Sequence, residues 1–201
     1  MKINHNILYL NYNKLFIKII FILISTISSI AFAQDNKIAS VIEISGEAIA
    51  LTEDGDEREL EIFDNLFIED EIFIGDDSSV TIQFNDNTTI ILKELTSLNV
   101  KEFEDSEAGA VFKMKLGKGE IIIESGSIAK NKNGEMLVDL SNMSLGVRGT
   151  RFNAGITNDG KSKVALAEDS FGDVGEIEIS SEGQKTNLNT TDQVVEVSED
   201  R

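Results

Sequence analysis

The stretch from Ser79 to Leu92, Ser-Val-Thr-Ile-Gln-Phe-Asn-Asp-Asn-Thr-Thr-Ile-Ile-Leu, decides the fold class. In its first half the apolar residues Val80, Ile82 and Phe84 alternate with polar ones. Alternation with a period of two indicates a strand with one buried face. The central 85–87 segment has turn chemistry, because Asn and Asp tolerate left-handed backbone conformations and bond to their own backbone. The stretch therefore predicts two half-buried strands joined by a turn.

The same alternation recurs along the chain in windows around 57–62, 112–116, 136–140, 164–166 and 177–179. In the first window it places Leu60 and Ile62 on one face, opposite the glutamates. Turn residues separate the windows at the spacing typical of all-β folds. No window shows a convincing helical period, and the best helical candidate is 102–110. We therefore predict an all-β fold of short strands, arranged as a twisted β-solenoid or a sandwich-like stack.

The N-terminal segment has the features of an export signal. Its only charges are Lys2, Lys14 and Lys18, and an apolar run ends in Ala31-Phe32-Ala33. The run after Lys18 is shorter than the ~20 residues that span a bilayer. We predict a signal peptide over 1–33, cleaved between Ala33 and Gln34, with an uncleaved anchor as the alternative.

The predicted organisation after this segment is one β domain over 34–190 and an acidic tail over 191–201. The expected location is the periplasm or the outside of the cell. A membrane is then contacted only transiently, through the signal peptide.

The composition excludes several classes of function. The chain has no Cys and no Trp, and its one histidine, His5, and both tyrosines lie within 1–33. Zinc sites, Cys/His catalysis and the aromatic platforms of sugar-cleaving enzymes are therefore excluded, and we expect no enzyme activity and no cofactor. A net charge of -18 repels nucleic acids. Calcium is a weak possibility against plain acidic turns, with Asp54, Asp56, Asp76 and Asp77 as the candidate ligands.

Charge is unevenly distributed. The segment 53–77 holds twelve acidic residues and one basic residue, Arg58, whereas 111–151 holds seven basic and four acidic residues. The charged side chains of these two segments either lie on solvated strand faces or guide docking to a protein or an envelope polymer. The basic positions considered for docking are Lys113, Lys115, Lys118, Arg148 and Arg151.

A second motif is Gly146-Val147-Arg148-Gly149-Thr150-Arg151-Phe152. Its glycines allow a tight turn or a close backbone approach. Val147 and Phe152 can enter the core. Arg148 or Arg151 can donate to exposed carbonyls or, alternatively, contact a carboxylate of a partner.

Three stretches in this order carry a family resemblance. They are Ile72-Phe73-Ile74-Gly75-Asp76-Asp77-Ser78-Ser79-Val80 with the following strand and turn to Thr88, then Lys118-Gly119-Glu120-Ile121, and finally the motif at 146–152. Over 41–155 the chain resembles the FecR-domain family of periplasmic proteins. Asp86-Asn87 stands where that family usually has an Asp-Gly turn.

The resemblance implies a β module that either binds or scaffolds in the cell envelope, or transmits an envelope signal, for example one linked to iron uptake. The best-known members of the family carry an anti-sigma segment before a membrane helix and a receptor-contacting domain after the β module. Only thirteen residues precede Lys14 here and 49 follow Phe152, and neither region is expected. We therefore expect the binding module rather than the full signalling protein.

Overall fold

The structure is a computed structural model that describes residues 37–106, 109–191 and 193–198. The predicted signal peptide and its cleavage site, Ala33–Gln34, lie outside these residues. Within them, no helix has the length and apolar character needed to cross a membrane.

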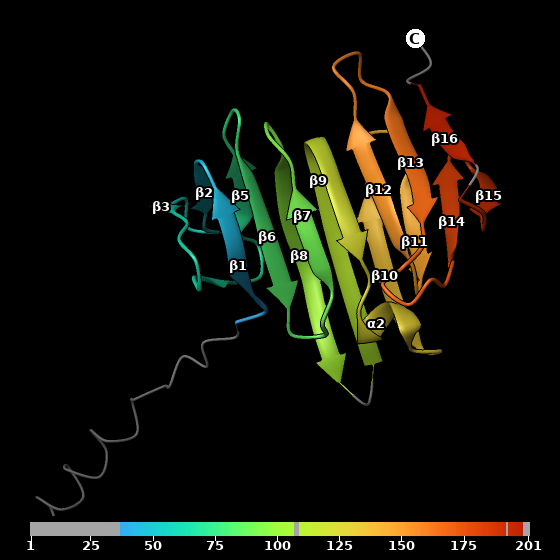
Figure 1. Cartoon of the computed structure of the whole chain (residues 1–201), viewed down its shortest axis with the longest axis horizontal. Helices are drawn as coiled ribbons and strands as arrows, with labels where there is room; N and C mark the ends of the chain where they lie inside the picture. The colour runs from blue at the N-terminus through green and yellow to red at the C-terminus, as the bar shows by residue number, and fades with distance from the viewer. Residues whose placement is uncertain (1–36, 107–108, 192, 199–201) are drawn as a thin grey trace, which may run out of the picture. The chain divides into compact units, whose positions relative to one another are not determined.

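Sixteen strands and one short helix make up the described domain (Figure 1). The helix is only four residues long, whereas β9 extends over sixteen residues. The elements are β1 (Ala39–Ser45), β2 (Ala48–Leu51), β3 (Glu57–Glu59), β4 (Asn65–Leu66), β5 (Glu71–Ile74), β6 (Ser79–Phe84), β7 (Thr89–Leu92), β8 (Ser97–Ser106), β9 (Gly109–Glu124), α2 (Ser127–Lys130), β10 (Gly134–Asp139), β11 (Ser144–Arg148), β12 (Arg151–Ile156), β13 (Ser162–Ala167), β14 (Glu176–Ser181), β15 (Gln184–Leu188) and β16 (Val194–Val197).

The strands form two layers that share β9 (Figure 1). The first layer has the order β4-β1-β6-β7-β9-β12-β13-β16, and the second has the order β3-β2-β5-β8-β9-β10-β11-β14-β15. The first half of β9 pairs with β8 and β10, and its second half with β7 and β12. Among the described strands the sheet is open, and β3, β4, β15 and β16 lie at its edges.

The core lies between the layers, where the apolar positions of the alternating windows meet. Phe84 of the first layer and Phe112 of the second are both buried, and their ring centroids are 4.6 Å apart. Phe103 completes this cluster at 5.0 Å from Phe112, nearly perpendicular to it. Aromatic pairs at these distances add to the stability that their buried area provides. The core is thus aliphatic with a small phenylalanine cluster.

The predicted all-β class is confirmed, in the form of an open two-layer sheet. The stretch that predicted a hairpin forms β6 and β7, with Gln83 opposite Thr89. The helical candidate at 102–110 is wrong, because its residues belong to β8 and β9 on either side of the undescribed pair 107–108. The helix α2 was not predicted. It spans a single turn, too short to show a helical period.

The expected orientation of Ile62 is also wrong. Leu60 is buried, but Ile62 is 46% exposed. The alternation ends at Leu60 because a turn follows, in which the Asp64 amide donates to the Glu61 carbonyl at 3.1 Å. The strand β16 falls within the stretch that the sequence assigns to the acidic tail.

Candidate functional site

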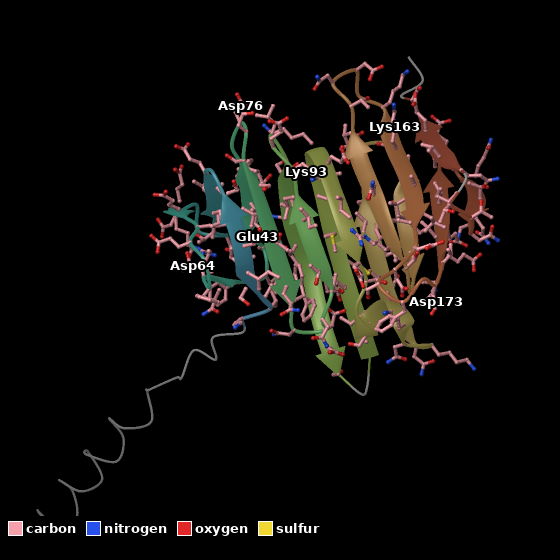
Figure 2. The ribbon with its side chains drawn as sticks, viewed as in Figure 1. Glu43, Asp64, Asp76, Lys93, Lys163 and Asp173 are labelled. Carbon is pink, nitrogen blue, oxygen red and sulfur yellow. The ribbon has the colours of Figure 1, made fainter. Side chains whose placement is uncertain are left out.

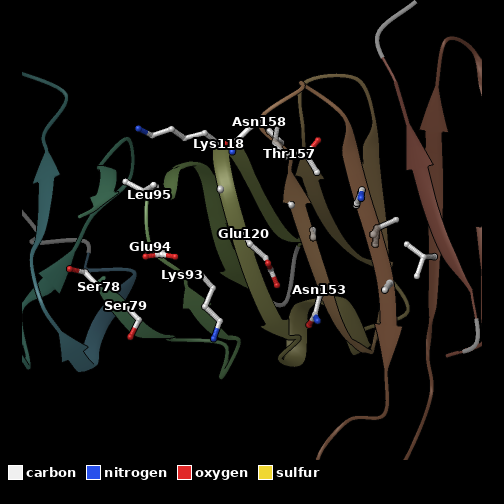
Figure 3. A pocket seen from close by; sticks show the side chains of 18 of the residues that line it. Ser78, Ser79, Lys93, Glu94, Leu95, Lys118, Glu120, Asn153, Thr157 and Asn158 are labelled. Carbon is white, nitrogen blue, oxygen red and sulfur yellow. The ribbon is translucent and has the colours of Figure 1, made fainter. Parts of the chain in front are cut away.

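A groove of about 1270 Å³ runs over the outer face of the first layer, across β9, β12 and β13 (Figure 3). Its origin lies in the strand register. Gly155 of β12 is opposite Glu120 of β9 on one side and Lys163 of β13 on the other. Because Gly155 has no side chain, the surface between the two charged residues is hollow.

The next row of residues continues the hollow. Ala165 lies opposite Asn153 on one side and opposite Val194 of β16 on the other. The small side chain of Ala165 thus lies between the exposed amide of Asn153 and the side chain of Val194, which is 65% exposed. The floor of the groove consists of small residues, and its walls carry polar and charged groups.

A kink in β9 places Glu120 at the groove. Gly119 has a φ of +82°, and a Cβ there would lie 2.5 Å from the Cα atom of Thr96. Thr96 fixes the kink, since its Oγ1 accepts from the Glu120 amide and donates to the Glu120 carbonyl, both at 3.1 Å. Glycine is required where the backbone is both left-handed and closely approached.

Three lysines line the groove, and they differ in their partners. Lys163 Nζ lies 3.0 Å from Glu196 Oε2 of β16. Lys93 and Lys118 are exposed and form no salt bridge with any residue of the described chain (Figure 3). The groove therefore offers two ammonium groups to a ligand, beside the amide of Asn153 and the carboxylates of Asp77, Glu94 and Glu120.

Glu196 links its own strand, β16, to β13 and to the loop before β13. Its carboxylate bonds to Lys163 at 3.0 Å and to Lys161 at 3.1 Å. The hydrogen bond from Lys163, followed by that from Lys161, lowers the pKa of Glu196. The same pairing raises the pKa of Lys161. The raised pKa of Lys161 and the lowered pKa of Glu196 both favour the charged forms, so this ion pair keeps its charges over the physiological pH range.

At the near end of the groove, the structure gathers three carboxylates. Single oxygens of Asp76, Asp77 and Glu94 lie within 4.8 Å of one another, and all three residues are exposed. Glu94 accepts from the Asp77 amide at 3.0 Å, which joins the β5–β6 turn to the β7–β8 turn. Asp54 and Asp56 lie in the exposed β2–β3 turn and are not part of this group. Calcium at any of these residues stays a prediction.

The motif at 146–152 carries the chain from the second layer to the first. Gly146, Val147 and Arg148 belong to β11, and Arg151 and Phe152 begin β12. Val147 and Phe152 are buried in the core. Arg148 is exposed, and its Nη1 donates to the Gly134 carbonyl at 2.7 Å. A contact between Arg148 and a partner stays a prediction.

The centre of the motif is a tight crossing. Gly149 has a φ of +55°, and Thr150 is buried. The Thr150 amide donates to Ser125 Oγ at 2.8 Å, and this hydroxyl donates to the Thr150 carbonyl at 2.9 Å. Gly175 packs on the crossing so closely that a Cβ would lie 2.1 Å from the Gly149 carbonyl oxygen. These contacts fix the point at which the chain passes from the second layer to the first.

The basic positions named from the sequence do not form one surface. Lys113 and Lys115 lie in the half of β9 that belongs to the second layer, where Lys113 bonds to Glu102 at 2.9 Å. The hydrogen bond to Glu102 raises the pKa of Lys113. Only Lys118 reaches the groove. The groove residues Lys93, Asn153 and Lys163 were missed, because each stands alone as an outward polar residue and only strand pairing brings them together.

The comparisons with known proteins give the family. A protein-family model described as "FecR protein" matches residues 70–170 of the 201-residue chain. Among curated proteins, none is significantly similar in sequence.

Solved structures resemble the chain only loosely. Two crystal structures of a "putative anti-sigma factor" from Parabacteroides distasonis have 15% and 16% sequence identity and TM-scores of 0.47 and 0.46. In both cases 65% of this chain and 60% of the other chain are covered, so the chain spans less than two thirds of their length. A structure described as a "Cell surface anchoring domain" has 27% identity over 31% of this chain and 82% of its own, with a TM-score of 0.30.

Proposed function

Because the chain belongs to the FecR protein family, we propose that it is a non-enzymatic binding or scaffolding module of the cell envelope. Its ligand is a protein or an envelope polymer that lies in the groove over β9, β12 and β13. The observation that carries this proposal is the row Glu120–Gly155–Lys163, in which a glycine opens a floor between charged walls.

The groove suits an elongated ligand with anionic and hydrogen-bonding groups. Lys93 and Lys118 offer ammonium groups, which attract carboxylates or phosphates from a distance. Asn153 can donate and accept hydrogen bonds, and Val194 offers an apolar contact. All stand on or next to paired strands, whose rigidity keeps the loss of conformational entropy on binding small.

The proposed location is the periplasm or the outside of the cell. The basic, apolar and small-residue regions of 1–33 support export. The full chain has a net charge of -18, and such an acidic protein stays soluble in this compartment. The two groove lysines place positive charge among the carboxylates that line the groove.

Charge reversal at the groove tests the proposal. The double variant Lys93→Glu/Lys118→Glu is expected to bind the envelope ligand about tenfold more weakly, because two attractive contacts become repulsive. The measurement is capture from envelope extract at low and high salt, followed by titration of the captured ligand. Binding to the wild type should weaken as salt shortens the Debye length to ~10 Å at 0.1 M and below.

Lys37→Glu/Lys132→Glu is the matched control, since it changes the net charge equally at exposed positions that do not line the groove. It should retain the ligand. A third variant, Ala165→Leu, fills the floor without changing any charge and should also weaken binding. Equal losses in the groove and control doubles would contradict the proposal.

A second candidate function is a regulatory module that transmits an envelope signal, for example one linked to iron uptake. Membership of the FecR family favours it. It differs from scaffolding in its consequence, because loss of a regulator changes transcription. Deleting the gene and measuring transcripts with and without iron limitation separates the two functions. Unchanged transcripts would contradict the regulatory function and leave scaffolding as the remaining proposal.

A further inference from the structure

A second surface lies on β1 and on the turn that precedes β4, near one edge of the first layer. The strand β1 pairs with β6, whose Ser79 lines the end of the groove. The second surface is formed by Ile42, Ile62 and Phe63, which are 41%, 46% and 81% exposed. We call these three residues the apolar tip. Figure 2 labels Glu43 and Asp64, which flank the tip on its two chain segments.

The apolar tip is held in place by backbone hydrogen bonds. The Phe63 amide donates to the Val41 carbonyl at 2.9 Å, and the Val41 amide donates to the Asp64 carbonyl at 3.0 Å. The register of β1 shifts between Val41 and Glu43, so Ile42 is the extra residue of a β-bulge. A bulge redirects side chains, and here it leaves Ile42 exposed, next in sequence to Val41, whose carbonyl accepts from the Phe63 amide.

The turn that presents Phe63 is closed at both ends. The Glu61 amide donates to Asp64 Oδ2 at 2.9 Å, and the Asp64 amide donates to the Glu61 carbonyl at 3.1 Å. The exposed aromatic side chain therefore projects from an ordered turn. An ordered aromatic group loses little conformational freedom when a partner covers it.

The conformation of Phe63 is costly for the protein itself. Its φ is +75°, a left-handed value at which glycine and asparagine are common and a bulky aromatic residue is an outlier. The side chain contributes little to the core, since most of it is exposed. Folding alone thus gives no reason for phenylalanine at this position, whereas binding of another molecule does.

The charges around the tip select the partner. Glu43 and Glu61 are exposed and Asp64 is half-buried, while the nearest basic residue in sequence, Arg58, is bonded to the buried Asp70 at 2.5 Å. This acidic rim repels anionic membranes and a second copy of the chain. An apolar surface with an acidic rim is complementary to a protein segment whose apolar side chains are flanked by basic ones.

We propose that the apolar tip is a docking site for a partner protein, through a segment in which basic and apolar side chains alternate. Phe63 is the anchor that enters the partner. Ile42 and Ile62 widen the apolar contact, and the acidic rim pairs with the basic side chains. None of the three residues of the apolar tip lines the groove.

A peptide probe tests the docking site. An acetylated peptide of alternating Lys and Leu should bind the wild type, and Phe63→Asn should weaken it about tenfold, as loss of an aromatic anchor does. Asparagine accepts the left-handed conformation, so the variant should be at least as thermostable as the wild type. A lost fold therefore cannot explain lost binding. The readout is fluorescence anisotropy with a labelled peptide, beside a thermal melt of each variant.

Phe171→Asn is the matched control. Phe171 is 83% exposed and lies in another acidic turn, next to Asp169 and Asp173, so it tests whether any exposed aromatic residue suffices. This variant should bind the Lys–Leu peptide as the wild type does, and a Lys–Ser peptide should bind all forms weakly. Equal affinity of both variants for the Lys–Leu peptide would overturn the proposal, as would self-association of the wild type that Phe63→Asn abolishes.

Discussion

Replacing Asp86 with alanine is expected to lower the free energy of unfolding by about 3 kcal/mol. Asp86 is 1% exposed, and its carboxylate accepts three hydrogen bonds. They come from the Thr88 amide at 2.9 Å, the Thr88 hydroxyl at 2.8 Å and the Ile128 amide at 3.3 Å. Alanine leaves all three donors without this acceptor in a site that little water reaches.

The loss extends beyond the hairpin between β6 and β7. The main-chain carbonyl of Asp86 accepts from the Ser127 amide at 2.8 Å, so the turn also holds the first residue of α2. The measurement is chemical denaturation of Asp86→Ala beside Asp54→Ala, an exposed aspartate in the β2–β3 turn. The control should stay within ~0.5 kcal/mol of the wild type. Equal midpoints for the two variants would show that the Asp86 network contributes little.

Gly175→Ala is the second substitution with a large expected effect, about 3 kcal/mol of lost stability. A Cβ at this position would lie 2.1 Å from the carbonyl oxygen of Gly149 and 2.5 Å from that of Arg148. Both obstacles are backbone atoms, so they cannot move aside as the end of a side chain can. The layers must separate locally, at the crossing that the motif 146–152 provides.

Gly146→Ala is the matched control within the motif. Its Cβ would meet nothing closer than 3.7 Å, which is an ordinary contact, and we expect a change of less than about 1 kcal/mol. Gly149→Val should lie between the two. It strains a residue with a φ of +55° and approaches Lys130 Cγ at 3.2 Å, at a cost of ~1–3 kcal/mol. Thermal or chemical denaturation of the three variants gives the order. Equal stability of Gly175→Ala and Gly146→Ala would contradict the close approach of Gly175 to the carbonyl oxygens of Gly149 and Arg148.

Much of the fold follows from local patterns. The period-two alternation of 79–92 predicts β6, β7 and their turn, because each strand buries one face and the turn residues are adjacent in sequence. Val147 and Phe152 were expected in the core for the same reason and are buried there. Local rules suffice where the partner of a residue is its near neighbour in the chain.

The rest depends on contacts between distant segments. The role of β9 in both layers requires a kink at Gly119, and this kink depends on Thr96 in another strand. Ile62 follows the alternation, yet the turn closed by Asp64 exposes it. The groove could not be predicted, since it results from Gly155 lying between Glu120 and Lys163, which is a matter of strand register.

Site-specific crosslinking tests most directly the claim that this chain is an envelope module that binds through its groove. The chain has no cysteine, so Asn153→Cys and Asn133→Cys each give a single attachment point, the first on the groove and the second on an exposed turn away from it. In intact cells, a membrane-impermeant photoreactive maleimide should label both variants. It should then yield a crosslinked ligand from Asn153→Cys alone, in an amount that falls as salt rises. Failure of the reagent to reach either cysteine, or equal crosslinking from both positions, would contradict the account.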